Sequence, residues 1–457
     1  MYREKLRKLT LFFICCTIIL CSLIFIRISE MPDDILLLEG EQHLFDIKLP
    51  INISINTREN EILKFNGTSL KNGKLKFSLS SPLTLESSKY GKTDFDIKLF
   101  GHIPIKHITV NVIPQIEVIP GGQPIGVKMT TKGVMVVGIS PVAGTDGKQY
   151  NPSEEAGVQA GDTILKINGT SVKDGDHVSR LVGMSGGKPL KLTIIRDGKE
   201  SELSIKPVKS KDDGGYKIGA WIRDSTAGVG TLTFYCPSDG SFGALGHPIT
   251  DIDTGVMLSV DTGEIVPSKI ISIQPGVRGK PGELKGLFID DEDEIGVIKK
   301  NTICGIYGKA YKKVVNNIYS EPIQIGLQNQ IREGPAKMLT TINGTDVKAY
   351  DIVIEKLTNQ TKPNPKSMII RVNDPELLGK TGGIVQGMSG SPIIQDGRLV
   401  GAVTHVFINR PDMGYGIYIE WMLKEAGIGI YEKSQVINEG GYSSFFYNEP
   451  SFKLKIS

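Results

Sequence analysis

Residues 381–394 read TGGIVQGMSGSPII, in which two glycines bracket Ser389 and an apolar segment follows the Ser-Pro pair. A nucleophilic serine must project from a tight turn, while nearby N–H groups point at the oxygen that becomes negative in a tetrahedral intermediate. Glycine permits such a turn because it has no Cβ to clash with the backbone. The stretch therefore predicts a nucleophile at Ser389, in a turn that leads into a β-strand.

The string G-M-S-G-S-P resembles the G-x-S-G-[GS]-P signature of trypsin-like serine peptidases. That resemblance implies an oxyanion hole formed by the amides of Gly387 and Ser389. The nucleophile elbow of α/β-hydrolases, G-x-S-x-G, fits less well because Ser391 stands at its last position. A phosphate-binding loop at Gly379-Lys380-Thr381 is excluded, because Asp374 occupies the position where that motif needs a glycine.

A serine nucleophile needs a base, and the base needs an orienting acid. Two histidines lie in this half of the chain. His247 stands in the turn-rich segment FGALGHPI (242–249), which can present an imidazole at a cleft. His405 follows Ser389 by 16 residues in an apolar strand, where a histidine of the core or cleft wall is the simpler interpretation. We therefore expect His247 to be the base.

The chemistry leaves four candidates for the acid: Asp251, Asp253, Asp374 and Asp396. Asp374 follows a strand-like apolar run, and the order His247, Asp374, Ser389 is that of trypsin-like peptidases. The interval of 15 residues between Asp374 and Ser389 is much shorter than in those enzymes.

Short strand patterns separated by turns run from about 208 to 432, which is typical of a β-barrel or double-barrel domain. Residues 27–114 contain alternating segments such as FDIKLF and predict a small all-β module with its linker. The tail 433–457 gives no prediction. The fold class expected is mainly β, with a trypsin-like β-barrel peptidase domain.

Residues 115–207 contain AGVQAGDTILKING (156–169), a run that resembles the PDZ family. In that fold, a glycine-rich loop offers backbone N–H groups to a peptide carboxylate, and the next strand accepts the peptide as an added strand. The resemblance places these roles on Gly121, Gly122, Ile125 and Gly126. His177, in the second predicted helix, could contact a ligand side chain or simply lie exposed.

Residues 1–8 are basic, and residues 9–26 form an uncharged, mostly apolar run. A helix of that length spans about 27 Å, enough for the hydrocarbon core of a bilayer. No small-x-small cleavage site follows, so we expect an uncleaved transmembrane signal-anchor rather than a signal peptide. The basic flank predicts a cytoplasmic tail at 1–8 and places the rest of the chain across the membrane.

The net charge is +3 with no long basic run, which does not indicate a nucleic-acid partner. Only two of the five cysteines, Cys236 and Cys304, lie outside the apolar run. They could form a disulfide, but two buried thiols are the default expectation. The acidic run 290–294 lacks the spacing of a known calcium loop. No metal or cofactor is expected.

The arrangement as a whole resembles the stage IV sporulation protein B peptidases of spore-forming bacteria. The likeness runs from the N-terminal anchor through IPGGQPIGVK (119–128) and the PDZ run to FGALGHPITD (242–251) and GMSGSP (387–392). It implies a triad at His247, Asp374 and Ser389.

The resemblance also implies a role. Such a peptidase crosses the inner forespore membrane and cleaves itself. It then cuts a membrane-bound regulator of an intramembrane metalloprotease, which leads to sigma factor activation. The alternative is a catalytically inactive PDZ adaptor that organises a membrane complex.

Overall fold

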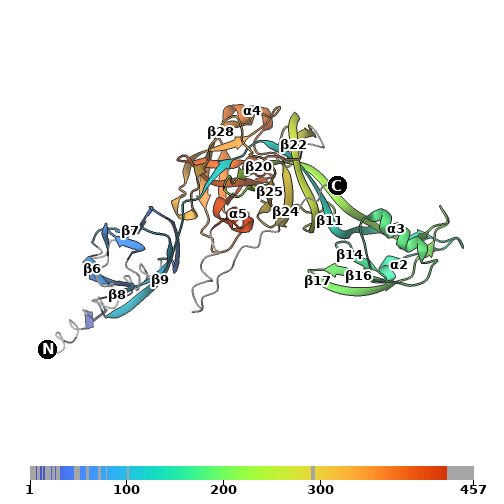
Figure 1. Cartoon of the computed structure of the whole chain (residues 1–457), viewed down its shortest axis with the longest axis horizontal. Coiled ribbons are helices and arrows are strands. Elements are labelled where there is room, and N and C mark those ends of the chain that lie inside the picture. Colours follow the sequence, from blue (N-terminus) through green and yellow to red (C-terminus); the bar gives the residue numbers. More distant parts are fainter. Residues whose placement is uncertain are drawn as a thin grey trace, which may run out of the picture.

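The computed structural model describes residues 7, 11–12, 14–15, 22, 26, 31–45, 52–57, 61–69, 74–78, 80–99, 102–289 and 294–429. Strands dominate, which confirms the mainly β class. Three parts lie in a row: an N-terminal β module, a central β body and a PDZ part (Figure 1). The predicted anchor at 9–26 lies largely outside the described residues, as does the tail 433–457. Among the residues that are described, no helix is long and apolar enough to cross a membrane.

The N-terminal module is a pair of small sheets around its own core. One sheet has the order β1-β9-β8-β3-β6 and the other β2-β7-β4-β5. The strands alternate buried and exposed residues, as the sequence pattern predicts, and the buried side chains of the two sheets meet. The strands are β1 (Asp34–Leu38), β2 (Gln42–Phe45), β3 (Asn52–Thr57), β4 (Leu63–Phe65), β5 (Thr68–Ser69), β6 (Lys74–Ser78), β7 (Leu83–Ser87), β8 (Gly91–Leu99) and β9 (Ile103–Ile113).

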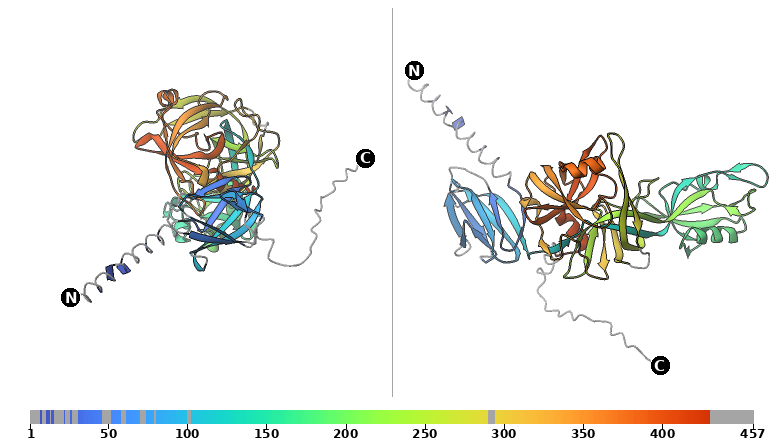
Figure 2. Two further views of the ribbon diagram at one scale, coloured as in Figure 1. Left: turned by 90° about the vertical axis from the view of Figure 1, so that its left-hand side faces the viewer. Right: turned by 90° about the horizontal axis from the view of Figure 1, so that it is seen from above.

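This module is docked on the central body rather than merely tethered to it. Leu38 and Ile113, at the ends of β1 and β9, belong to the hydrophobic core of the central body. Beside them, Arg398 donates to the nearly buried carboxylate of Glu41 at 2.5 Å. Figure 2 shows the module lying against the central body.

The PDZ part has a compact core under a sheet of β14, β16 and β17 and the second half of β11. Its longer helix, α3, begins where Asp174 accepts a hydrogen bond from the amide of His177 at 2.6 Å, a standard N-cap. The elements are β11 (Pro124–Ile139), β12 (Val142–Ala143), β13 (Gln149–Tyr150), α2 (Pro152–Glu155), β14 (Thr163–Ile167), β15 (Thr170–Ser171), α3 (Gly175–Met184), β16 (Leu190–Arg196), β17 (Lys199–Ile205), β18 (Val208–Lys209) and β19 (Tyr216–Lys217).

Two long strands join the PDZ part to the central body. β11 and β20 (Ala220–Tyr235) pair antiparallel over most of their length, from Pro124 opposite Thr231 to Ile139 opposite Ala220. The first half of β11 also pairs with β22 in the central body, whereas its second half pairs with β14 in the PDZ part. The predicted boundaries at 115 and 207 therefore assign β11 and β20, which pair with each other, to different domains.

The central body contains a closed barrel of six strands with the order β27-β28-β29-β32-β31-β30. A long sheet that includes β20, β21 and β22 packs beside it. The barrel elements are β27 (Gly334–Thr340), β28 (Lys348–Leu357), β29 (Met368–Val372), α4 (Pro375–Thr381), β30 (Pro392–Gln395), β31 (Arg398–Phe407), β32 (Arg410–Tyr418) and α5 (Ile419–Ala426). The others are β10 (Glu117–Pro120), β21 (Ser241–Ala244), β22 (Val260–Gln274), β23 (Glu283–Phe288), β24 (Gly296–Thr302), β25 (Gly305–Ala310), β26 (Ile323–Gln324) and η1 (Gln328–Gln330).

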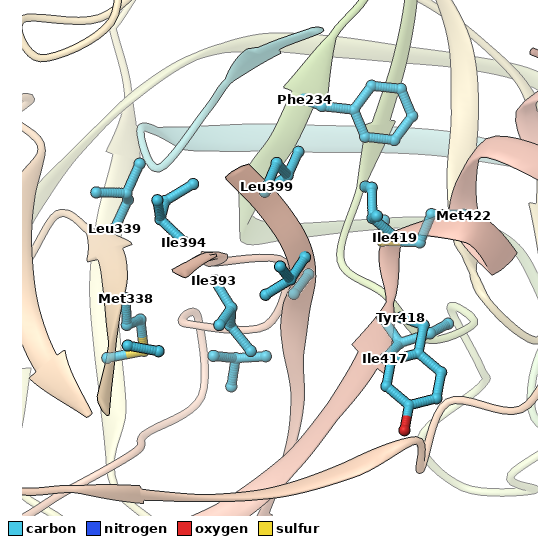
Figure 3. Close-up of a cluster of buried hydrophobic side chains, with 14 of the residues drawn as sticks. Phe234, Met338, Leu339, Ile393, Ile394, Leu399, Ile417, Tyr418, Ile419 and Met422 are labelled. Atoms are coloured by element: carbon cyan, nitrogen blue, oxygen red, sulfur yellow. The ribbon is translucent and has the colours of Figure 1, made fainter. Parts of the chain in front are cut away.

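One continuous core fills the barrel and extends to the neighbouring sheet. Figure 3 shows side chains from β20, β27, β30, β31, β32 and α5 converging there, including Phe234, Met338, Ile393, Leu399, Ile417 and Met422. Cys236 and Cys304 belong to this core as free, buried thiols, and burial raises the pKa of Cys304 to about 12. The structure thus has two buried thiols at these positions, where the sequence also allowed a disulfide.

Candidate active site

Ser389 stands in a tight turn between α4 and β30. The flanking Gly387 and Gly390 have φ values of +95° and +94°, in the left-handed region that favours glycine. A Cβ on Gly390 would lie 2.2 Å from the carbonyl oxygen of Thr231, so only glycine lets the turn approach β20 so closely. The Ser389 hydroxyl donates to the carbonyl of Thr404 on β31 at 2.8 Å.

β20 holds this turn from one side through three hydrogen bonds. The Thr231 hydroxyl donates to the Gly387 carbonyl at 2.7 Å, and the Thr231 amide donates to the Ser389 carbonyl at 3.1 Å. The Thr233 hydroxyl donates to the Gly390 carbonyl at 2.8 Å. The amides of Gly387 and Ser389, by contrast, have no hydrogen-bond acceptor within the described part of the chain. Two such amides are the donors that an oxyanion hole requires.

His247 follows β21 through two residues, Leu245 and Gly246, whose φ values of +69° and +71° turn the chain sharply. Its Nδ1 lies 2.8 Å from the carbonyl oxygen of Pro248, so Nδ1–H donates there and Nε2 is left as the acceptor. The imidazole is half-buried, and this desolvation lowers the pKa of His247 below its ordinary value of 6.5. The ring is therefore kept in the neutral form that a general base needs.

His247 and Ser389 line the same cavity, of about 440 Å³. No hydrogen bond joins them in this conformation, because the hydroxyl is turned to Thr404. His405 also lines the cavity, with its ring centroid 5.2 Å from that of His247. Burial lowers the pKa of His405 to about 4, and a positive charge on Lys366, or on His247 when that ring is protonated, acts in the same direction. Apart from Gln386 and the threonines, most of the remaining wall is apolar, with Val229, Leu245, Ile384, Val385 and Val406.

Asp374 has a different role in the structure from the one the triad prediction gave it. It is the N-cap of α4, where its carboxylate accepts from the amide of Leu377 at 3.0 Å. The same carboxylate accepts from the amide of Asp351 at 3.3 Å. Neither a hydrogen bond nor an ion pair links it to His247 among the described residues. The carbonyl of Pro248 takes the place beside Nδ1 that a triad gives to the acid.

The other three candidate acids are also engaged elsewhere. Asp251 and Asp253 both bind the guanidinium of Arg223, and Asp251 also accepts from Thr254. Asp396 pairs with Arg332 at 2.8 Å. The structure thus brings together the predicted nucleophile and base but, within the residues it describes, places no carboxylate in contact with the base.

The four residues predicted for the peptide site of the PDZ domain lie in the central body instead. The amides of Gly121 and Gly122 donate to the carbonyls of Thr233 and Leu232, both at 2.8 Å. Ile125 is fully buried, and both edges of its strand are paired, with β20 and with β22. Gly126 lies on the same paired strand. The prediction that this loop binds a peptide carboxylate is therefore wrong, because neighbouring strands already use the groups it would need.

The sequence reasoning did not single out Thr231, Thr404 or Pro248. No local pattern distinguishes Thr231 or Thr404, because their roles depend on segments more than 150 and about 15 residues away. The role of Asp374 did have a local signal. Asp-Pro-Glu at 374–376 is the start of a helix as capping rules describe it, with Asp at the N-cap and Pro at the first helical position.

The comparisons with known proteins fit this division of the chain. A family model described as SpoIVB peptidase S55 matches residues 214–423, and one described as a PDZ domain matches residues 125–206. A "Putative zinc metalloprotease LL2128" from Lactococcus lactis subsp. lactis (strain IL1403) is 43% identical over 68 residues, 15% of each chain. A "Probable periplasmic serine endoprotease DegP-like" from Bartonella henselae is 31% identical over 108 residues, 22% of this chain and 21% of that protein. The chain thus spans about a fifth or less of the length of these curated relatives.

Two solved structures match part of the chain at low identity and low TM-score. The active form of the Rv3671c protease from M. tuberculosis has a TM-score of 0.24 and 14% identity, covering 44% of this chain and 75% of that one. The HtrA-type protease AlgW with a decapeptide has a TM-score of 0.25 and 12% identity, covering 45% and 53%. By the two family matches, residues 214–423 belong to the SpoIVB peptidase S55 family, and a PDZ domain at residues 125–206 is joined to them.

Proposed function

We propose that this protein is a serine endopeptidase in which Ser389 is the nucleophile and His247 the general base. The observation that carries the proposal is that both side chains line one cavity, with the serine on a turn that leaves two amides unengaged. Membership of the peptidase family supports the same conclusion.

The reaction requires one rotation. The Ser389 hydroxyl must turn from the Thr404 carbonyl toward Nε2 of His247, which is the free acceptor because Nδ1–H is bound to Pro248. Its oxygen then bonds to the scissile carbonyl carbon while the proton passes to Nε2. The oxyanion lies against the amides of Gly387 and Ser389, an arrangement typically worth about 3–4 kcal/mol of barrier.

The intermediate collapses as the C–N bond breaks and Nε2 returns the proton to the leaving amine. Water then hydrolyses the acyl-enzyme by the same route in reverse, with His247 as base. These steps use only groups of this chain.

His247 is oriented in this mechanism by the carbonyl of Pro248 rather than by a carboxylate. A carbonyl fixes the tautomer and the ring direction but supplies less stabilisation of the imidazolium than a charged acid does. Asp374 would act on the site indirectly, because it caps the helix from which the chain leads into the Ser389 turn.

A serine-directed fluorophosphonate tests the proposal. Labelling of the full-length chain that disappears in Ser389→Ala, and is lost from His247→Gln, is the expected result. Equal labelling of wild type and Ser389→Ala would show that the reactive serine is elsewhere.

We also propose, on the strength of the family match, the role that the family resemblance implies. The protein would be membrane-anchored by residues 9–26, with its catalytic part extracytoplasmic, in the space between the forespore membranes. It would cleave itself and then a membrane-bound regulator of an intramembrane protease, leading to sigma factor activation. Expression of wild-type and Ser389→Ala chains in the same cells tests the first step: only the wild type should give shortened fragments.

A further inference from the structure

β20 has one open edge that connects the PDZ part to the active-site cavity. One edge of β20 pairs with β11 along residues 220–231. On the other edge, β21 covers only the stretch from Leu232 to Tyr235. Between Ala220 and Gly230, no strand from the described residues pairs with this second edge.

The backbone groups that face the open edge can be identified. The Thr231 amide and carbonyl both point away from β11, since they bond to Ser389 and Leu245. The Asp224 carbonyl points toward β11, where it accepts from the hydroxyl of Thr131. Successive residues of a strand direct their hydrogen-bonding groups to opposite sides. Odd-numbered residues from 225 to 229, where the pairing with β11 keeps a regular register, therefore present their N–H and C=O groups to the open edge. Register shifts between Thr130 and Met135 and between Val136 and Gly138 of β11 interrupt this alternation toward Ala220.

The two ends of this edge lie at two different sites. At one end, Thr226 to Val229 line the cavity that holds Ser389 and His247. At the other end α3 begins beside the strand, where the amide of Gly175 donates to the Asp224 carboxylate at 2.9 Å. α3 also carries the imidazole of His177, whose Nδ1 is buried without a partner among the described residues. A chain entering at this end would supply the kind of partner that a buried polar atom normally has.

From this geometry we propose that the open edge of β20 binds the substrate as an added strand, from the scissile bond at Ser389 to α3 of the PDZ part. The proposal deepens the proposed function and rests on it. A row of unpaired N–H and C=O groups at strand spacing is complementary to an extended polypeptide. Its continuity with the cavity makes that polypeptide the substrate itself.

The direction of the strand sets the polarity. β20 runs from α3 toward Ser389, and antiparallel pairs make the better hydrogen bonds. An antiparallel substrate therefore enters the cavity with its scissile bond and continues downstream, toward its C-terminus, along β20 to α3. About ten residues, or roughly 33 Å of extended chain, cover that distance. The substrate class is an unfolded segment with at least that length of chain after the scissile bond.

A peptide series tests this requirement. β-Casein, reduced and alkylated, is first digested with the full-length protein, and mass spectrometry identifies a rapidly cleaved sequence. That sequence is then made with 3, 6, 9, 12 or 15 residues downstream of the scissile bond, and in a second series with the same lengths upstream. We expect kcat/KM to rise about tenfold or more as the downstream length reaches about ten and then to level off, because the added contacts act within one chain. The upstream series should show no such step.

One pair of variants connects the effect to the edge. Ser225→Pro removes one N–H that faces the open edge and none that faces β11, a placement that edge strands tolerate. Ser225→Ala keeps the N–H and serves as the matched control. The ratio of kcat/KM for the 15-residue and 3-residue peptides should fall several-fold in Ser225→Pro and stay unchanged in Ser225→Ala. Circular dichroism confirms that both variants are folded.

The failure of this inference is distinguishable from the failure of the proposed function. A downstream series with no dependence on length, or a ratio unaffected by Ser225→Pro, would overturn the added-strand inference while leaving a serine peptidase. Cleavage of the 3-residue peptide that persists in Ser389→Ala would overturn the proposed function instead.

Discussion

Asp374 and Ser389 are 15 residues apart, and both were predicted to belong to one triad, but their surroundings differ in kind. The contacts of Asp374 are made mostly within its own neighbourhood, at the start of α4 and at Asp351. The Ser389 turn is held by residues from β20, more than 150 positions earlier in the chain. The difference teaches that the reactive geometry is set by the packing of two sheets against each other, whereas Asp374 maintains the helix that precedes it.

The largest effect should come from the hydroxyl of the turn itself. Ser389→Ala removes the nucleophile and should lower kcat/KM by at least about 10³-fold, leaving only what binding and the oxyanion donors supply. Ser391→Ala is a matched control two residues away, since the Ser391 hydroxyl is buried and has no hydrogen-bond partner among the described residues. It should retain activity and lose no stability. Peptide hydrolysis measures the activity of the two variants, and thermal unfolding measures their stability. Equal activities would contradict the assignment of Ser389 as the nucleophile.

The next test distinguishes which of two histidines, His247 or His405, acts as the base for Ser389. His247→Gln should lower kcat/KM by about 10³-fold, because the base that the Pro248 carbonyl orients is lost. His405→Gln should lower it by less than about tenfold, as expected for a residue of the cavity wall. The reverse order of effects would make His405 the base, and both variants are compared on the same peptide.

The support from β20 can be weakened without touching the reactive groups. Thr231→Val leaves the Gly387 carbonyl without its donor, and we expect a loss of about 1–3 kcal/mol in stability together with about a tenfold loss in kcat/KM. Thr341→Val is the control, since the buried Thr341 hydroxyl bonds the carbonyl of another glycine, Gly122, at 3.2 Å. It should cost similar stability in urea titrations but leave kcat/KM unchanged. A Thr231→Val enzyme with normal kcat/KM would mean that the turn keeps its shape alone.

A smaller effect should distinguish a helix cap from a triad acid. Asp374→Asn keeps an oxygen that can cap α4, so kcat/KM should stay within about twofold of the wild type. Asp374→Ala removes the cap, which should cost about 1 kcal/mol of stability and several-fold in kcat/KM. A triad acid would behave differently, because Asn would then be as damaging as Ala. That result would require Asp374 to reach His247 in a conformation other than this one.

The smallest effect is a displacement on the pH axis. The base is active when neutral, and burial lowers the pKa of His247 below 6.5. As pH falls, the imidazole therefore stays neutral past the point where an exposed histidine would be protonated. The acid limb of kcat/KM should have its midpoint below pH 6.5 for the wild type. A midpoint at or above 6.5 would indicate a carboxylate near the ring in the active form, because such a neighbour raises the pKa.

Much of this molecule could be predicted because the informative patterns are local. Glycines around Ser389 and the turn before His247 specify their own backbone, and the PDZ run specifies a helix, a turn and a strand within a few residues. Ser389 and His247 were correctly expected at one cleft for that reason. The partners of a strand are not local in this sense. The segment PIGVKM at 124–129 would show the same sequence pattern beside a peptide groove as it does between two strands. Its pairing with β20 and β22 can be seen only in the folded sheet.

The role of Asp374 is harder to predict for a related reason. Asp374 satisfies a rule of chain order for a triad and a rule of helix capping at the same time. The rule of chain order rests on a likeness between families, whereas the capping rule rests on a hydrogen bond of known geometry. In this structure the hydrogen bond describes the residue better.

The shared ribbon of β11 and β20 also limits how this protein can be taken apart. Deletion of residues 115–207 would remove more than a separate domain. It would take away β11, which lies between β20 and β22, and leave the facing edges of both strands unpaired. Loss of activity in such a truncation would then report a damaged catalytic body rather than a missing recognition module. The same shared strands couple the orientation of the PDZ part to that of the central body, because β11 pairs with strands of both.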